Sequence, residues 1–151
     1  MATSAIAACV DKYATLSGVP QPLYFGDVPV SDGTSQILPP YVALIDEGMK
    51  PEFNFVTSEV LEATDLTFMV YGNSLAAVDA IVQAIKYNGQ VPSAAAGFDF
   101  GTLASLESPY RTLSIYRTSE RRFVAETTGK QSQRISGCEL KYRVSIFLYG
   151  T

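Results

Sequence analysis

Apolar residues recur at helical spacing in two parts of the chain. In the first part they lie three or four residues apart, at Ile6, Cys9, Val10, Tyr13 and Leu16. This spacing predicts an amphipathic helix that begins after Ser4 and ends near Gly18. In the second part the apolar stripe consists of Leu75, Val78, Ile81, Val82 and Ile85. It predicts a second helix, which Asn73 and Ser74 would cap and a left-handed turn at Asn88–Gly89 would end.

Short apolar runs and alternating apolar and polar residues predict strands elsewhere in the chain. The predicted strands are Leu23–Val28, Tyr41–Asp46, Asp65–Tyr71, Arg111–Thr118, Arg122–Glu126 and Glu139–Leu148. Because side chains alternate across a strand, Leu66, Phe68 and Val70 should share one face. The last strand has the clearest alternation, which predicts one buried face and one solvated face.

The predicted elements follow the order helix, strand, strand, strand, helix and then strands, which favours an α+β fold. In this fold an antiparallel sheet has two helices packed on one face. The chain has 151 residues, of which 47% are hydrophobic, and this supports a single domain over residues 1–151. No apolar run reaches membrane-spanning length, and the N-terminus lacks the basic flank of a signal peptide. We therefore expect a protein made and used in a cytoplasm, without a membrane partner.

Three segments are expected to connect these elements. Pro29–Pro40 is predicted to be a surface loop and Thr127–Gly137 an exposed mobile loop, whereas Pro92–Pro109, rich in Ala, Gly, Ser and Phe, is predicted to be a long, partly ordered connection. Thr127–Gly137 contains one apolar side chain, Ile135. One hypothesis is that this segment is an assembly arm, loose in the free subunit and ordered against a neighbour through Lys130 and Arg134. The alternative is a plain solvent loop that joins a hairpin.

The net charge of −4 conceals an asymmetry along the chain. Residues 1–110 hold three Lys/Arg and twelve Asp/Glu, a balance of −9, whereas residues 111–151 hold eight and three, a balance of +5. Both segments could simply be solvated, or acidic and basic faces could meet head to tail between copies of the chain. For the second case the candidate interface residues are Lys130, Arg134, Arg121, Arg122, Glu59 and Glu62.

Catalytic and cofactor motifs are missing from the sequence. The chain has no histidine, which excludes histidine-based triads and most transition-metal sites. No glycine-rich phosphate loop or calcium-loop pattern is present, and the cluster that includes Asp46, Glu47 and Asp65 is interpreted as a solvated acidic face. We expect no catalytic residues, no cofactor and no metal. Cys9 and Cys138 are expected to be buried thiols without a disulfide.

A run of arginines with aromatic neighbours resembles a patch that could contact a nucleic-acid backbone. Its members are Tyr110, Arg111, Tyr116, Arg117, Arg121, Arg122 and Phe123. Alternating strand patterning explains the aromatic residues as core, and the acidic total charge opposes non-specific binding. We expect no sequence-specific recognition of nucleic acid.

The order and spacing of several motifs resemble the tail-terminator (tail-completion) proteins of long-tailed bacteriophages. The motifs are an opening helix, the Leu23–Phe25 strand, Pro39–Val42 (PPYV), a strand ending in Tyr71–Gly72, the helix Ser74–Tyr87 and the closing strand Lys141–Tyr149. Pro92–Pro109 and Thr127–Gly137 do not match the family pattern.

The resemblance implies a structural virion protein, assembled in the host cytoplasm and located in the tail or neck. It would form a ring, usually a hexamer, at the head-proximal end of the tail, end growth of the tail tube and join the tail to the head. Its partners would be copies of itself, the tail-tube protein and the head connector or stopper protein. DNA would pass through the ring. No catalytic residues are carried over from the family.

Two other classes of function stay open. The chain could be another head–tail morphogenesis subunit, such as a head-completion or tail-tube protein. It could also be a small-molecule-binding or enzymatic α+β domain that uses carboxylates and tyrosines.

Overall fold

The computed structural model describes residues 4–26, 38–53, 60–88, 97–99, 103, 105–106, 110–126 and 134–148. Within the four long strands it describes the side chains of residues 41–48, 63–72, 114–124 and 135–146. The elements are α1 (Ala5–Thr15), β1 (Tyr24–Phe25), β2 (Tyr41–Phe53), β3 (Val60–Gly72), α2 (Leu75–Tyr87), β4 (Tyr110–Glu126) and β5 (Arg134–Leu148). The prediction of an α+β fold is confirmed.

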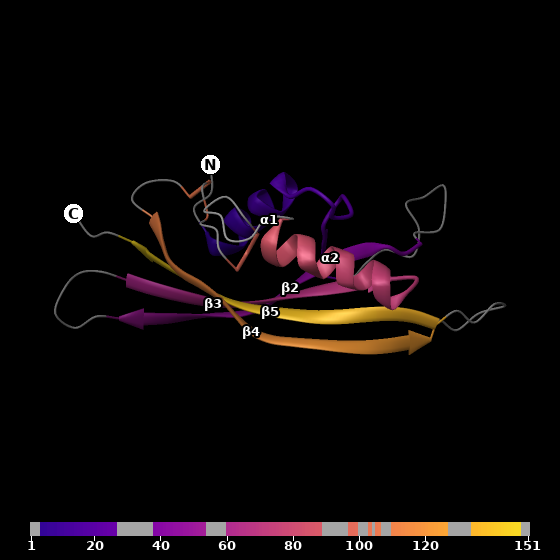
Figure 1. The fold of residues 1–151 in the computed structure, drawn as a ribbon. Coiled ribbons are helices and arrows are strands. Elements are labelled where there is room, and N and C mark those ends of the chain that lie inside the picture. The colour runs from indigo at the N-terminus through magenta and orange to yellow at the C-terminus, as the bar shows by residue number, and fades with distance from the viewer. Residues whose placement is uncertain are drawn as a thin grey trace.

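The strands form one five-stranded sheet in the order β1-β2-β3-β5-β4. All neighbours are antiparallel except β1 and β2, which are parallel. Both helices lie on the same face of this sheet and contact its central strands β3 and β5 (Figure 1). The β2–β3 and β4–β5 pairs extend to opposite ends of the sheet (Figure 1). One face is therefore covered by helices, and the opposite face is named the uncovered face below.

Both helices begin and end where local sequence signals place them. The Ser4 and Ser74 hydroxyls accept hydrogen bonds from the Ala7 and Ala77 amides at 3.3 and 3.1 Å, which satisfies amides that the first turn leaves unpaired. Asn88 ends α2 in the left-handed conformation with φ 53°. Its side-chain oxygen accepts a hydrogen bond from the Ser17 amide at 2.9 Å and so ties α2 to the segment after α1.

The predicted apolar stripe of α2 is correct except at its first residue. Leu75 is exposed, whereas Ala84, which the pattern did not include, is buried. The helix axis rises only about 1.5 Å per residue, so the first turn of α2 lies at the border of the core and Leu75 points past it.

Phe68 on β3 lies at the centre of the core. Its ring centroid is 6.0 Å from that of Tyr13 on α1, 4.9 Å from that of Phe98 and 6.1 Å from that of Tyr142 on β5. Leu66, Phe68 and Val70 are all buried on the covered face, as predicted. The Cys9 and Cys138 thiols are buried in the same core and are free, which agrees with the expectation of no disulfide.

Phe98 comes from Pro92–Pro109, a segment expected to be a long, partly ordered connection, and it is fully buried. The Phe98 and Asp99 amides donate to the Ile85 and Lys86 carbonyls at 2.8 and 3.1 Å, near the end of α2. The turn therefore binds carbonyls near the end of α2 and also places the Phe98 side chain in the core. This ordered turn is compatible with the partly ordered connection that was expected, but its place in the core was not predicted, because the Ala- and Gly-rich stretch has no apolar periodicity.

The second half of the sheet differs from the prediction. Arg111–Thr118 and Arg122–Glu126 are parts of one strand, β4, whose pairing with β5 shifts register between Thr112 and Ser114 and again between Arg117 and Ser119. An irregularity of this kind adds a residue without ending the strand. The polar residues between the two predicted strands therefore stay in the sheet.

Residues 134–137 belong to β5, so the prediction that Thr127–Gly137 is a loop or arm was wrong at its C-terminal end. Ser136 pairs with Gly72 on one side and with Val124 on the other, and Ile135 is buried. A Cβ at Gly137 would lie 2.3 Å from the Phe123 ring, so this glycine makes room for the aromatic side chain. Residues 127–133, including Lys130, lie outside the described part of the chain.

The strands of the first half are confirmed with changed bounds. β1 is shorter than Leu23–Val28, of which residues 27–28 are not described, and β2 and β3 extend well beyond Tyr41–Asp46 and Asp65–Tyr71. Most of Pro29–Pro40 is also outside the described residues. Among the helices that the structure describes, none is long and apolar enough to span a membrane.

Replacing Phe98 with Ala should lower the free energy of unfolding by about 3–5 kcal/mol, because the large ring is fully buried against Phe68 and Tyr142. Urea unfolding followed by circular dichroism measures this change. Leu75→Ala is the matched control and should change stability by at most about 0.5 kcal/mol, because Leu75 is exposed. Equal stability of Phe98→Ala and the wild type would contradict the placement of this turn in the core.

Candidate assembly surface

A row of aromatic side chains crosses the uncovered face of the sheet. The ring centroids of Tyr24 and Tyr41 are 6.4 Å apart, those of Tyr41 and Tyr71 5.0 Å, and those of Tyr71 and Phe123 5.8 Å. On β5 the row passes over Gly137, which has no side chain to block it. Burial raises the pKa of Tyr41, and burial, Tyr41 and Glu139 raise that of Tyr71. The row reaches from β1 at one edge of the sheet to β4 at the other.

Beside this row the uncovered face is polar, and its charges are paired across strands. Arg121 contacts Glu139 at 2.8 Å, and Arg143 contacts Asp65 at 2.8 Å. The Asp65 hydrogen bond is the main reason that the pKa of Arg143 is raised. These pairs leave the described part of the face mixed in charge.

Glu47 and Asp46, two carboxylates of the predicted acidic cluster, also contact groups of the same chain. Glu47 lies 3.4 Å from the Lys141 amine and accepts a hydrogen bond from the Thr67 hydroxyl at 2.9 Å. Asp46 accepts one from the Gly48 amide at 2.9 Å. Within the described part of the chain, no group of three residues is arranged to hold a metal ion.

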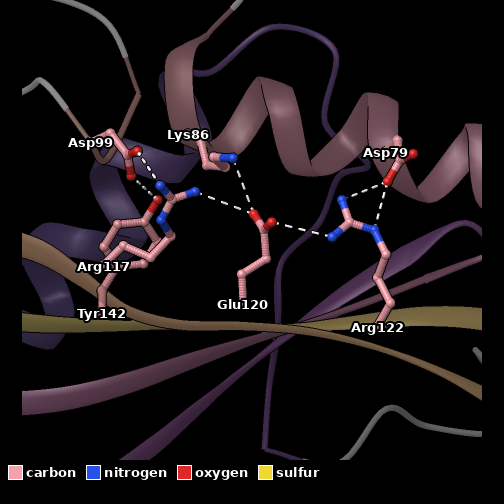
Figure 2. Close-up of polar contacts among 7 residues, drawn as sticks. All are labelled: Asp79, Lys86, Asp99, Arg117, Glu120, Arg122 and Tyr142. Carbon is pink, nitrogen blue, oxygen red and sulfur yellow. Dashed lines mark hydrogen bonds and ion pairs between the residues drawn. The ribbon is translucent and has the colours of Figure 1, made fainter.

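A second polar cluster lies on the covered side, between α2, the turn at residues 97–99 and strands β4 and β5 (Figure 2). This ionic cluster comprises Asp79, Lys86, Asp99, Arg117, Glu120, Arg122 and Tyr142. Its three acidic and three basic residues balance in charge.

Glu120 is the centre of the ionic cluster. It contacts Lys86 at 3.1 Å, Arg122 at 3.2 Å and Arg117 at 3.3 Å (Figure 2). Lys86 retains only 6% of its accessible surface, and a buried ammonium is costly unless a carboxylate accompanies it. Burial alone would raise the pKa of Glu120, but hydrogen bonds from Lys86 and Arg122 outweigh it and lower that pKa.

Aspartates hold the two outer arginines of the cluster. Arg122 reaches Asp79 on α2 at 2.6 Å, and Arg117 reaches Asp99 at 3.5 Å. The Tyr142 hydroxyl donates to Asp99 at 2.5 Å, and burial, strengthened by this bond, raises the pKa of Tyr142. Strand β4 is thereby fastened to α2 and to the 97–99 turn through charges.

The opposite charges of the two sequence segments pair with each other inside the subunit. Among the described residues, four ion pairs join acidic residues of the N-terminal segment to basic residues of the C-terminal one: Asp99–Arg117, Asp79–Arg122, Glu47–Lys141 and Asp65–Arg143. Neither of the two interpretations of this asymmetry included pairing within one chain.

The structure does not bring the described sequence candidates into one basic patch. Arg121 and Arg122 are neighbours on β4 and point to opposite faces, the first with its side chain 68% exposed beside Glu139 and the second held by Asp79 and Glu120. Glu62 and Arg134 lie in β3 and β5, but their side chains are outside the described part. Glu59 and Lys130 are themselves outside the described residues.

Two aromatic residues of the arginine run, Tyr116 and Phe123, are not core residues, contrary to the sequence interpretation. Tyr116 is exposed and Phe123 half-buried, both on the uncovered face. The alternation was identified correctly, but β4 is an edge strand, so the pattern alone could not show which face is buried.

The edges of the sheet are the features that the sequence did not reveal. β4 is 17 residues long, contains no proline, and has no strand on its outer side among the residues that the structure describes. Val124 near its end is 60% exposed, and Phe25 on the opposite edge strand, β1, is 61% exposed. Which strands form the edges depends on long-range pairing, which no local motif encodes.

Comparison with known proteins finds no matching family model and no matching curated protein. Among solved structures, a chain of the virion of the native gene transfer agent (GTA) particle is similar, with a TM-score of 0.54 and 16% sequence identity. The match covers 97% of this chain and 87% of that chain. At this identity the likeness establishes a shared fold over nearly the whole chain.

Replacing Glu120 with Gln should lower the free energy of unfolding by about 2 kcal/mol, because it leaves the buried Lys86 cation without its carboxylate. The matched control is Glu139→Gln on the uncovered face, whose partner Arg121 is exposed. That change should cost less than about 1 kcal/mol. Urea unfolding of both variants measures the difference, and equal effects would contradict the central role of Glu120.

The lowered pKa of Glu120 also predicts a pH dependence of stability. A carboxyl whose folded pKa lies below its unfolded value, 4.5 here, contributes stability above that value and loses it as pH falls through the folded pKa. The stability difference between wild type and Glu120→Gln should therefore be constant near neutral pH and shrink below about pH 4.5. Urea unfolding between neutral pH and about pH 3 tests this, and a difference that grows on acidification would refute it.

Proposed function

We propose that this chain is a non-catalytic structural subunit of a virion and forms a ring with copies of itself. The observation that carries the proposal is the fold shared with a chain of the gene transfer agent virion, which extends over 97% of this chain. The open sheet edges agree with a role in assembly, because an edge strand offers unpaired backbone groups to another chain. The use of Glu47 and Asp65 in cross-strand ion pairs agrees with a role that involves no catalysis.

Within this class we propose the role of a tail terminator. The support is the order of elements, since α1, β1, the PPYV motif before β2, the Tyr71–Gly72 end of β3, α2 and β5 follow the pattern of that family. The ring, a hexamer in this proposal, would lie at the head-proximal end of the tail. It would contact the tail-tube protein on one side and the head connector on the other, and DNA would pass through it.

Imaging of assembled particles that contain this chain tests the proposal. The expected result is one ring, with six copies, between the tail tube and the head connector, and particles without the chain should carry tails of irregular length. Rings stacked along the tail would indicate a tail-tube protein instead, and a ring within the head portal a head-completion protein. A single copy per particle, or a position away from head and tail, would overturn the ring itself.

A further inference from the structure

We propose that β4 of one copy pairs antiparallel with β1 of the next, so that the sheets of neighbouring copies join into one continuous sheet. This inference rests on the proposed ring and identifies the surface through which the copies meet. The partner is a second copy of this chain, because the two edges of its sheet are suited to each other in direction, level and side-chain chemistry.

Direction is the first argument. β1 and β2 run the same way, β3 runs opposite to them, β5 opposite to β3, and β4 opposite to β5. The two edge strands are therefore antiparallel to each other. Rotation about an axis along the strands preserves direction, so β4 of one copy would meet β1 of the next in the antiparallel arrangement, the slightly more stable kind of pairing.

The second argument is that the two edge strands lie at the same position along the strand direction. Arg121 pairs with Glu139, Glu139 with Met69, Met69 with Ala43 and Ala43 with Tyr24. This cross-strand row places β1 level with the part of β4 from Ser119 to Glu126, where no register shift interrupts the pairing with β5. The regular part of β4 would therefore lie level with β1 of the next copy.

Edge protection is the third argument. Natural sheets commonly prevent edge-to-edge association with a very short edge strand, free charges or proline. β1 is short, but β4 has 17 residues and no proline, and its arginines Arg117, Arg121 and Arg122 are engaged by carboxylates of the same chain. Among the side chains of β4 that the structure describes, these arginines therefore already have partners before a neighbouring strand arrives.

Side-chain chemistry is the fourth argument. On the uncovered face, Tyr24 packs diagonally against Tyr41, the neighbour two positions from its register partner Ala43. Phe123 lies in the same cross-strand row as Tyr41, so Tyr24 of the next copy would find Phe123 in an equivalent diagonal position. On the other face, the exposed Phe25 would lie level with Glu120 of the neighbouring copy, and the exposed Val124 would lie about four residues further along β4.

Cross-linking of assembled particles tests the inference with the double variant Phe25→Cys, Val124→Cys. In level strands these positions are about four residues apart, or about 14 Å, so a flexible bismaleimide of that reach should join each copy to the next. The native Cys9 and Cys138 thiols are buried, and burial raises the pKa of Cys9 to about 12, so they should not compete. The expected result on a denaturing gel is a ladder that ends at the number of copies in the ring.

The controls separate this inference from the proposed function. The single variants should give at most dimers, and Phe25→Cys combined with Ala14→Cys on the exposed side of α1 should give no ladder. Rings seen by microscopy without a ladder, or with the same ladder in the Ala14 control, would overturn the edge pairing and leave the ring intact. Particles that contain the chain but show no ring would overturn both.

A second experiment measures how well a variant of the joint is incorporated into particles. Val124→Asp should reduce incorporation into particles by at least about tenfold, because it places a new unpaired charge in the joint. The urea midpoint of the isolated subunit should stay unchanged because Val124 is exposed. Ala14→Asp should assemble normally, and normal assembly of Val124→Asp would count against the proposed joint.

Discussion

Packing around the Phe68 ring is the interaction on which the rest of the structure depends. It brings together α1 through Tyr13, the 97–99 turn through Phe98 and β5 through Tyr142. These segments are far apart in the sequence, and each is too short to be stable by itself in water. Because the sheet has helices on one face only, this cluster also decides which face is covered. The uncovered face must then be stabilised by contacts within the sheet.

The apolar core contacts the edge strand β4 through Ile115, and farther along the strand ion pairs take its place. Toward α2, β4 presents Arg117, Glu120 and Arg122 instead of apolar residues, so the space is filled by the ionic cluster. Buried charges are retained only when each has a partner with good geometry. The opposite charges of the two segments of the sequence supply those partners. Part of the acidic and basic excess therefore forms the ion pairs that hold β4 against α2 and the 97–99 turn.

Local signals predicted local structure well. Ser4, Ser74 and Asn88 marked the helix ends correctly because a cap forms with residues only a few positions away. The strand faces of β3 and β5 also followed from alternation. The continuity of β4 and the inclusion of residues 134–137 in β5 did not, because they depend on cross-strand register and on the fit of Phe123 over Gly137.

The candidate surface was predictable only in part, for the same physical reason. Arg121 and Arg122 were identified by residue type, but their opposite orientations and separate partners require the register of β4. Phe98 and Asp99 gave no sequence signal, since their roles come from contacts with β3, β4 and β5.

An edge strand whose described charges have partners in the same chain would suit a subunit that joins others as proposed. Backbone pairing along an edge needs no large apolar patch, so the free subunit can keep a polar surface. The specificity of such a joint comes from the few side chains at the ends of the row, Tyr24 and Phe25 on β1 and Phe123 and Val124 on β4. Because these two sets differ, contact between them is heterologous, and a heterologous contact closes into a ring only when each copy is rotated by a fixed angle. That rotation is about an axis along the strands, so it corresponds to curvature of the joined sheet and is distinct from the twist between neighbouring strands.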